Sequence, residues 1–400
     1  MFRVAALVAA SLIAFSAQAQ DALRPDVGKP LQAAQELIKA GKYKEALAKV
    51  RDADAVAGKT AGESFMIERM RIAAASGAGE VDTAAKSFEA LAASGKVAAA
   101  DKARMAESIA GGYYRNKEYA KAMQWGQRYF KEGGTSPAIR TLLIQSQYLS
   151  GDFAGAAREL TVEIQAAEKN GTPPAQDRLN LLLNAATQLK DPNATVFALE
   201  RLVTYYPKKE YWVDLLSRMQ RKPNFSDRLV LDTYRLSLAT GSMSAANDYM
   251  EMSQLALQAG HAAEAKQVVD KGFAANVLGQ GAEAERHKRL RDLVAKKLEE
   301  AKAGEAAAQQ EAAAAKDGNG LVNIGFALAA GGEPAKGLPL IQQGITKGGL
   351  KRAEDAKLHL GIAQVLAGDT KAQATLRSVG GNDGTADLAR LWSLYARRKT

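Results

Sequence analysis

The residue types that most often do chemistry are scarce in this chain of 400 residues. The chain has no cysteine, which excludes thiolate catalysis, disulfide bonds and cysteine-based metal sites. Its three histidines, His261, His287 and His359, are far apart and lack the spacing typical of metal ligands. We therefore predict no metal site, and we expect each histidine to lie on a helix surface or to pack locally.

Other catalytic patterns are also missing or incomplete. No Gly-x-Ser-x-Gly nucleophile motif occurs. Gly58-Lys59-Thr60 resembles the end of a phosphate-binding loop, but Ala53 stands where that loop needs a glycine, and no strand is predicted before it. We predict no catalytic residue and no cofactor. The sequence does not exclude an enzyme that uses paired carboxylates, because helices can bring distant residues together. Such an enzyme predicts a compact cluster of buried carboxylates.

The charge of the chain favours anionic partners. Lysine and arginine number 54 against 44 acidic residues, which gives a formal charge of +10. Such a surface attracts acidic proteins, anionic polymers of the cell envelope or lipid head groups. Nucleic acid is another common partner of basic proteins, but the beginning of the chain argues for export, so we predict no nucleic-acid partner.

Residues 1–19 have the pattern of a secretory signal peptide. Arg3 is their only charge, residues 4–15 are apolar, and Ala17-Gln18-Ala19 places small residues where a signal peptidase cleaves. We predict cleavage after Ala19 and a periplasmic or otherwise exported mature chain. The apolar stretch is shorter than the roughly 20 residues that span a bilayer, and no later stretch is apolar enough, so we predict no transmembrane segment after signal removal.

A short string of residues recurs along the chain. It consists of a glycine or small polar turn, often an acid, then an aromatic or small residue, and an alanine three positions further on. Clear copies occupy residues 41–46, 117–122 and 151–156, and weaker ones residues 260–265, 332–337 and 368–373. Helical sequence precedes each turn. A repeat of this kind indicates helical hairpins, which cannot bury their apolar faces alone and therefore stack.

This pattern resembles the tetratricopeptide repeat family, whose unit is a helical hairpin of about 34 residues. The resemblance covers nearly all of the predicted mature chain, although each copy is degenerate. It implies an all-α fold, a right-handed α-solenoid of about ten hairpins. A small residue on each first helix would let the second approach, and the aromatic residue after the turn would fill the gap between hairpins. The small residues are Ala34, Ala110, Gly325 and Gly361, and the aromatic ones are Tyr43, Tyr119 and Phe153.

One segment differs from the rest. Residues 282–316 contain no proline or aromatic residue and carry dense charges. Their apolar helical stripe consists of Leu290, Leu293, Val294 and Leu298. They predict one long, charged, alanine-rich helix of roughly 50 Å. It is either a solvated helix with a frayed, linker-like end or a projecting coiled-coil arm that binds a partner. We accordingly predict an N-terminal solenoid over residues 20–281 and a C-terminal module over residues 317–400, with a boundary near residue 316.

The resemblance also implies where a partner would bind. In tetratricopeptide arrays the first helix of each hairpin lines a concave groove. The family's groove positions fall on Glu107, Tyr114, Thr141, Gln145 and Tyr148, and more weakly on Gln254. Tyrosines beside amides provide flat apolar area and directed hydrogen bonds, as a peptide groove needs. The alternative is that Tyr114 and Tyr148 are packing residues.

A second aromatic group is expected to be core rather than site. It combines tyrosines and a tryptophan with lysines that we place on a solvated turn. Its members are Tyr205, Tyr206, Lys208, Lys209, Tyr211 and Trp212. This string, with residues 333–395, is similar to periplasmic repeat proteins associated with envelope machinery, some of which accompany uptake systems of the TonB type.

Three functions follow from the sequence. The first is a periplasmic scaffold that binds a protein or peptide partner of the cell envelope, as an accessory to a transport or assembly machine. The second is binding of the cell wall or of anionic lipid through a basic surface. These two differ in salt dependence, because an electrostatic surface binder loses affinity as ionic strength rises. The third is an envelope enzyme.

Overall fold

The computed structural model describes residues 23–397, and within that range it contains α-helices and short 3-10 helices but no strand. The predicted signal peptide and the last three residues lie outside the described residues. The first nine helices are α1 Pro25–Lys39, α2 Tyr43–Asp54, α3 Ala61–Ala78, α4 Val81–Ala93, α5 Ala99–Arg115, α6 Tyr119–Lys131, α7 Pro137–Leu149, α8 Phe153–Lys169 and α9 Gln176–Gln188. The others are α10 Pro192–Tyr205, α11 Lys209–Gln220, α12 Val230–Thr240, α13 Ala246–Gln258, α14 Ala262–Ala274, α15 Ala284–Ala314, α16 Asn319–Ala330, α17 Pro334–Lys347, α18 Ala353–Ala367, α19 Ala372–Arg377 and α20 Thr385–Ala396.

The chain forms two compact units. The first, unit 1, comprises residues 23–170 together with 184–191, and the second, unit 2, comprises residues 171–183 and 192–397. The sequence predicted a boundary near residue 316, but residues 317–397 belong to the same compact unit as α10–α14. The reason is that the C-terminal helices pack on those middle helices, as described below.

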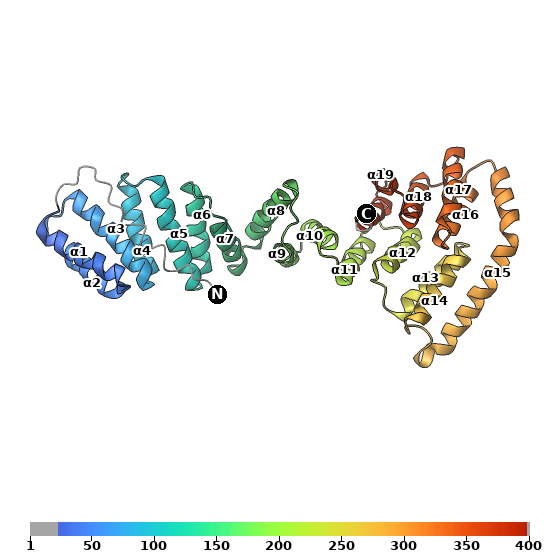
Figure 1. Cartoon of the computed structure of the whole chain (residues 1–400), viewed down its shortest axis with the longest axis horizontal. Coiled ribbons are helices and arrows are strands. Elements are labelled where there is room, and N and C mark those ends of the chain that lie inside the picture. Colours follow the sequence, from blue (N-terminus) through green and yellow to red (C-terminus); the bar gives the residue numbers. More distant parts are fainter. Residues whose placement is uncertain (1–22, 398–400) are drawn as a thin grey trace. The chain divides into compact units, whose positions relative to one another are not determined.

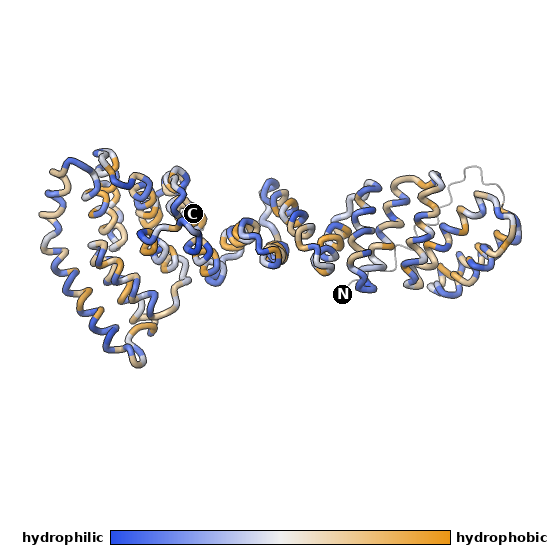
Figure 2. The backbone as a smooth tube through the Cα atoms, turned by 180° about the vertical axis from the view of Figure 1, so that it is seen from behind, coloured by the Kyte–Doolittle hydropathy of each residue, from blue (hydrophilic) through white to orange (hydrophobic). Residues whose placement is uncertain are grey.

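Unit 1 is a run of four hairpins, in which α1–α8 pack consecutively (Figure 1). The first helix of each hairpin also contacts the first helix of the next, in the order α1, α3, α5 and α7. Hydrophobic and hydrophilic residues alternate along these helices (Figure 2), as expected for elements that each bury one stripe. The predicted turn strings open the second helices, because α2, α6 and α8 begin at Tyr43, Tyr119 and Phe153. The turn residues Gly41, Lys117 and Gly151 all have positive φ.

The small residues lie where the sequence placed them. Ala34 and Ala110 have no exposed surface, as expected at the closest approach of paired helices. The ring of Tyr43 packs against Gly77 of α3, so close that a side chain at Gly77 would collide with it. Tyr43 therefore fills the space between the first and second hairpins, as predicted.

Unit 2 folds back on itself. The first helices of its C-terminal hairpins, α16 and α18, lie side by side and contact each other (Figure 1), and α16 contacts α14. Helix α20 contacts both α10 and α12. One hydrophobic core accordingly joins residues far apart in the sequence, such as Trp212 and Trp392, which are each 1% exposed.

Ion pairs and hydrogen bonds secure this closure. Arg228, just before α12, donates to both carboxylate oxygens of Asp355 on α18, at 2.8 and 2.9 Å, and to Asp383 at 2.7 Å. The Ser226 amide donates to the Asp383 carbonyl at 3.0 Å. Bidentate pairing of this kind fixes orientation as well as proximity, so the beginning of α12 is held against the beginning of α18.

Helices α16 and α17 approach through glycines. A Cβ on Gly325 would lie 2.7 Å from the carbonyl oxygen of Gly337, and a Cβ on Gly361 of α18 would collide with Leu376 of α19. Only glycine fits at such crossings. The predicted role of Gly325 and Gly361 is thus confirmed.

Helix α15 is the predicted long charged helix, 31 residues in length. Its beginning packs through His287, Leu290 and Val294 and its end through Ala312, while the stretch between them is mostly exposed. It contacts α13, α14 and α16. The helix is continuous and anchored at both ends, so neither the frayed end nor the projecting arm describes it.

Candidate functional site

The predicted groove residues of unit 1 meet on neighbouring helices. Glu107 and Tyr114 lie on α5 and Thr141, Gln145 and Tyr148 on α7, and these two helices contact each other. We call these five residues the α5–α7 face. All five are half-buried. The Tyr114 hydroxyl donates to Gln145 Oε1 at 2.9 Å, which joins the two helices across the face.

The tyrosines of the α5–α7 face also pack on the hairpin turns. The Tyr114 ring meets Tyr119 edge to face with centroids 5.6 Å apart, and Tyr148 meets Phe153 in the same way at 5.3 Å. Burial raises the pKa of Tyr114, so its hydroxyl remains a neutral donor. These contacts hold the rings in place from one side, so each tyrosine is a packing residue and a preorganised element of the face at the same time.

Glu107 is the one acid of the α5–α7 face. Burial raises the pKa of its carboxyl group, and no residue in the described range 23–397 makes a hydrogen bond or ion pair with it. Arg104, one turn earlier, is instead paired with Asp101. A half-buried carboxylate without a cation or donor is costly to keep charged.

The remaining sequence candidates lie in unit 2. Gln254 is exposed on α13. In the aromatic group at residues 205–212, Trp212 is core as predicted, Tyr206 donates to the Pro174 carbonyl at 2.9 Å, and Tyr211 donates to Asn180 at 3.2 Å. Lys208 and Lys209 are exposed, as expected of a turn.

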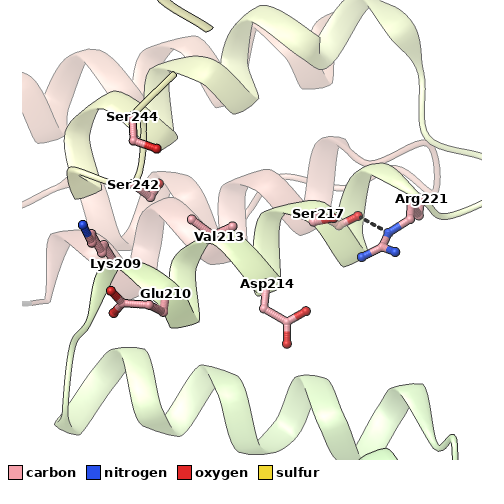
Figure 3. Close-up of a pocket in the computed structure, with 8 residues that line it drawn as sticks. All are labelled: Lys209, Glu210, Val213, Asp214, Ser217, Arg221, Ser242 and Ser244. Atoms are coloured by element: carbon pink, nitrogen blue, oxygen red, sulfur yellow. Dashed lines mark hydrogen bonds between the residues drawn. The ribbon is translucent and has the colours of Figure 1, made fainter. Parts of the chain in front are cut away.

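A surface pocket lies on the exposed side of α11 (Figure 3). Its lining residues are Lys209, Glu210, Val213, Asp214, Ser217, Arg221, Ser242 and Ser244. Val213 is 50% exposed, Asp214 is paired with Arg218, and Arg221 donates to the Ser217 carbonyl. Charges of both signs alternate around the pocket, so its electrostatics select no particular ligand.

The strongest concentration of charge is a buried cluster in unit 2, which the sequence did not predict. Arg235 of α12 donates to both oxygens of Glu264 on α14 and to Asp232, each at 2.7 Å, and its Nη2 lies 2.8 Å from His261 Nδ1. His359 of α18 reaches Asp232 through Nε2 at 3.2 Å. We call these five residues the Arg235 cluster.

The Arg235 cluster surrounds an aromatic ring. Phe326 of α16 has no exposed surface, the His359 ring stacks on it at 3.9 Å, and the Arg235 guanidinium lies over it at 4.6 Å. His261 also reaches Asn323 of α16 at 3.2 Å. The expectation that each histidine packs locally or on a surface is therefore wrong for His261 and His359, because folding back brings four helices together at this point. It is correct for His287, which accepts from the Gly279 amide at 3.0 Å.

The acids of the Arg235 cluster are held as carboxylates. Burial alone would raise the pKa of Glu264, but the charge and hydrogen bonds of Arg235 outweigh it and lower that pKa to about 2. Burial likewise opposes ionisation of Asp232, yet His359 and Arg235 hold its pKa well below the usual range. An acid with so low a pKa is a poor proton donor near neutral pH, so the cluster resembles a structural tie more than a pair of catalytic carboxylates.

Neither metal nor membrane features occur in the described part of the chain. Residues 23–397 contain no group of three or more histidine, cysteine or acidic residues that could hold a metal ion. Within the same range, no helix has the length and apolar content to cross a bilayer.

Sequence reasoning missed the Arg235 cluster, although a signal was present. Asp232 and Arg235 lie three residues apart in α12 among Leu231, Leu236 and other apolar residues. Charges at the buried positions of a helix need partners. The partners themselves, on α14 and α18, could not be read from a sequence without the fold.

No protein-family model matches the chain, and no curated protein sequence matches it. Among solved structures it is similar to yeast Tom70, at 10% identity and a TM-score of 0.26, over 93% of this chain and 96% of that one. It is also similar to the P58(IPK) TPR domain, at 12% identity and 0.22 over 93% and 98%. A third match, at 15% identity and 0.27 over 91% and 64%, is the structure of Naa15/Naa10 bound to HypK-THB. At such scores the case rests on the hairpins, turns and helix contacts of the chain itself, which make it an all-α solenoid of tetratricopeptide-like hairpins.

Proposed function

We propose that this protein is a scaffold that binds an extended segment of a protein partner on the α5–α7 face. The observation that carries the proposal is a contrast between hairpins at matching positions. Thr141 and Gln145 stand ten and six residues before the turn glycine Gly151, and both are half-buried. A polar, partly accessible position on a first helix is suited to a ligand rather than to a core.

The same positions on α16 and α18 of unit 2 are filled by the chain itself. Val322 and Phe326 stand ten and six residues before Gly332, and Leu358 and Ile362 stand ten and six before Gly368. Their exposures are 7%, 0%, 0% and 1%, because α16 packs against α14 and α18, and all four side chains belong to the shared core of unit 2. Helices α16 and α18 therefore use these faces internally, and the α5–α7 face of unit 1 keeps polar and aromatic groups for a partner.

The proposed scaffold acts in the periplasm. The signal-peptide pattern of residues 1–19 supports export to the periplasm, and a partner of this scaffold is then a protein of the cell envelope. Cell fractionation, with mass spectrometry of the mature N-terminus, tests this part. We expect a chain that begins at Gln20 in the periplasmic fraction, and a full-length chain in the cytoplasm would contradict it.

The binding function is tested by affinity capture from the envelope fraction. The mature chain and the Tyr114→Ala/Tyr148→Ala variant would be compared at low and high salt, with mass spectrometry of the retained proteins. We expect a protein that the mature chain retains at high salt and that the variant loses. Tyr43→Ala, which removes a packed ring between α2 and α3, is the matched control for loss of packing. Equal retention by all three chains would refute the proposed face.

The second candidate function, binding of an anionic wall polymer or lipid, is favoured by the charge of +10. It differs in its expected outcome. Retention would fall steeply between low and high salt, because exposed charges are screened beyond about 8–10 Å at physiological ionic strength. The Tyr114→Ala/Tyr148→Ala variant would be retained as strongly as the mature chain. Such a result in the same experiment would replace the first proposal with the second.

A further inference from the structure

Glu107 is an unsatisfied acid on a face that is otherwise neutral. It shares one side of α5 with Tyr114, seven residues and roughly 10 Å further along the helix axis. The neighbouring members of the face, Thr141 and Gln145, carry no charge. The site thus presents one half-buried carboxylate beside aromatic and amide groups, and no cation within residues 23–397 pairs with it.

Gln145 supplies the complementary hydrogen-bonding group. Its Oε1 accepts from Tyr114, and no described residue accepts from its Nε2. Two N–H donors therefore remain on the α5–α7 face, one helix away from the carboxylate. Donors of this kind suit the backbone carbonyl groups of an extended peptide.

We propose that the α5–α7 face selects a partner segment carrying an arginine or lysine side chain, which pairs with Glu107 while Gln145 binds the adjacent backbone carbonyl. This inference rests on the proposed function, since it names the kind of segment that the face takes. In the complex, the Glu107 carboxylate would gain the cationic hydrogen-bond donor that it lacks in the free protein.

The selection runs against the overall charge of the protein. The chain carries a formal +10, which attracts anions and repels basic partners at long range. A basic segment can therefore be recognised only through a local group such as Glu107.

Paired peptides separate charge recognition from general peptide binding. A peptide array would display each nine-residue sequence twice, once with arginine and once with citrulline at the centre, because citrulline keeps the shape but not the charge. The mature full chain is the probe. We expect arginine spots to retain about tenfold more protein than their citrulline partners, in keeping with a hydrogen bond between charged groups.

Glu107→Gln keeps the side-chain shape and removes the charge. We expect the two members of each peptide pair to retain this variant equally, with citrulline spots unchanged from the original chain. Glu89→Gln is the matched control, because Glu89 is an exposed acid on α4, and it should keep the tenfold preference. Thermal melting of each variant checks that it is folded. As a measurement that needs no variant, the preference of the original chain should shrink as salt rises while citrulline spots stay constant.

The outcomes distinguish this inference from the proposed function. Equal retention of arginine and citrulline spots by the original chain, with both reduced by Tyr114→Ala/Tyr148→Ala, would overturn the charge selection and leave the scaffold function standing. A preference for arginine that persists in Glu107→Gln would overturn it as well. Binding that no tyrosine substitution affects would instead overturn the proposed face itself.

Discussion

Arg235 ties together residues from three helices at the centre of unit 2. Its guanidinium group neutralises Asp232 of its own helix and Glu264 of α14, while His359 of α18 shares Asp232. The side chains of these acids and of Arg235 are only 5–6% exposed. Buried charges of this kind contribute little net stability as a group, but removing one member leaves the others unpaired.

We predict that Arg235→Met lowers the free energy of unfolding by about 3–5 kcal/mol, because it leaves two buried carboxylates without their cation. The measurement is the urea midpoint of the full chain followed by tryptophan fluorescence. Arg289→Met on the exposed side of α15 is the control and should change the midpoint little. If Arg235→Met changed the urea midpoint only slightly, water would have to reach the carboxylates of Asp232 and Glu264 in the variant.

The same acids predict sensitivity to low pH. The pKa of Glu264 is lowered to about 2 and that of Asp232 further below its usual range, both in the folded state. Because unfolded carboxyl groups titrate near about 4, this stabilisation is fully present above that pH and is lost as pH falls toward 2. We expect the urea midpoint of unit 2 to drop over that window. In Glu264→Gln the drop should be smaller. If this variant and the original chain lost stability equally at low pH, Glu264 would not be a source of the acid sensitivity.

The sequence suggested a candidate face, but it gave no prediction of the buried charges. Glu107, Tyr114, Gln145 and Tyr148 were carried over from the groove positions of the tetratricopeptide family, and they lie on the contacting helices α5 and α7. Whether Tyr114 packs or binds was left open, since that depends on Tyr119 across the turn. The Arg235 cluster needs contacts over more than a hundred residues of sequence, between Asp232 and His359, and no local pattern encodes them.

At the scale of elements, the turn strings were the most informative signal. Gly260, Gly332 and Gly368 belong to weak copies, yet each has positive φ and separates two helices. A left-handed turn residue is a local requirement, so it survives in degenerate repeats. The length of α15 was also predictable, because 282–316 and Ala284–Ala314 differ only at their ends. The packing of both its ends was not predictable, since an alanine-rich sequence gives little indication of which helices cover it.

Two glycine substitutions should have opposite effects. At Gly337 of α17 an added Cβ would collide with the Gly325 carbonyl, so Gly337→Ala should destabilise the protein by about 1–3 kcal/mol. At Gly304 of α15 a Cβ would meet nothing, so Gly304→Ala should stabilise the helix by roughly 0.5–1 kcal/mol. Thermal melting of both variants is the measurement. A neutral Gly337→Ala would show that α16 and α17 can separate without cost.

At the scale of the whole molecule, the two units differ in how their contacts are distributed along the chain. Helices of unit 1 contact near neighbours, whereas unit 2 joins α10 and α12 to α20. The sequence predicted an N-terminal solenoid and a C-terminal module with a boundary near residue 316. Hairpin patterns specify neighbours, and they carry no information about where an array turns back on itself.

We predict that unit 1 unfolds at lower urea concentration than unit 2. The three tryptophans report the units separately, because Trp125 lies in unit 1 and Trp212 and Trp392 share the core of unit 2. Fluorescence of Trp212→Phe/Trp392→Phe follows unit 1, and fluorescence of Trp125→Phe follows unit 2. Circular dichroism of the unaltered chain should then contain both steps. Coincident transitions would mean that the units unfold as one body.

The closure of unit 2 also bears on how such a protein can change its number of repeats. A hairpin duplicated within α1–α8 needs only to match its two neighbours, as in any linear array. A hairpin duplicated between α12 and α18 would separate Arg228 from Asp355 and Asp232 from His359, because these pairs depend on the number of helices between them. Copy number is thus free to drift in one unit and fixed in the other. Relatives of this chain that differ in length should gain or lose hairpins among α1–α8.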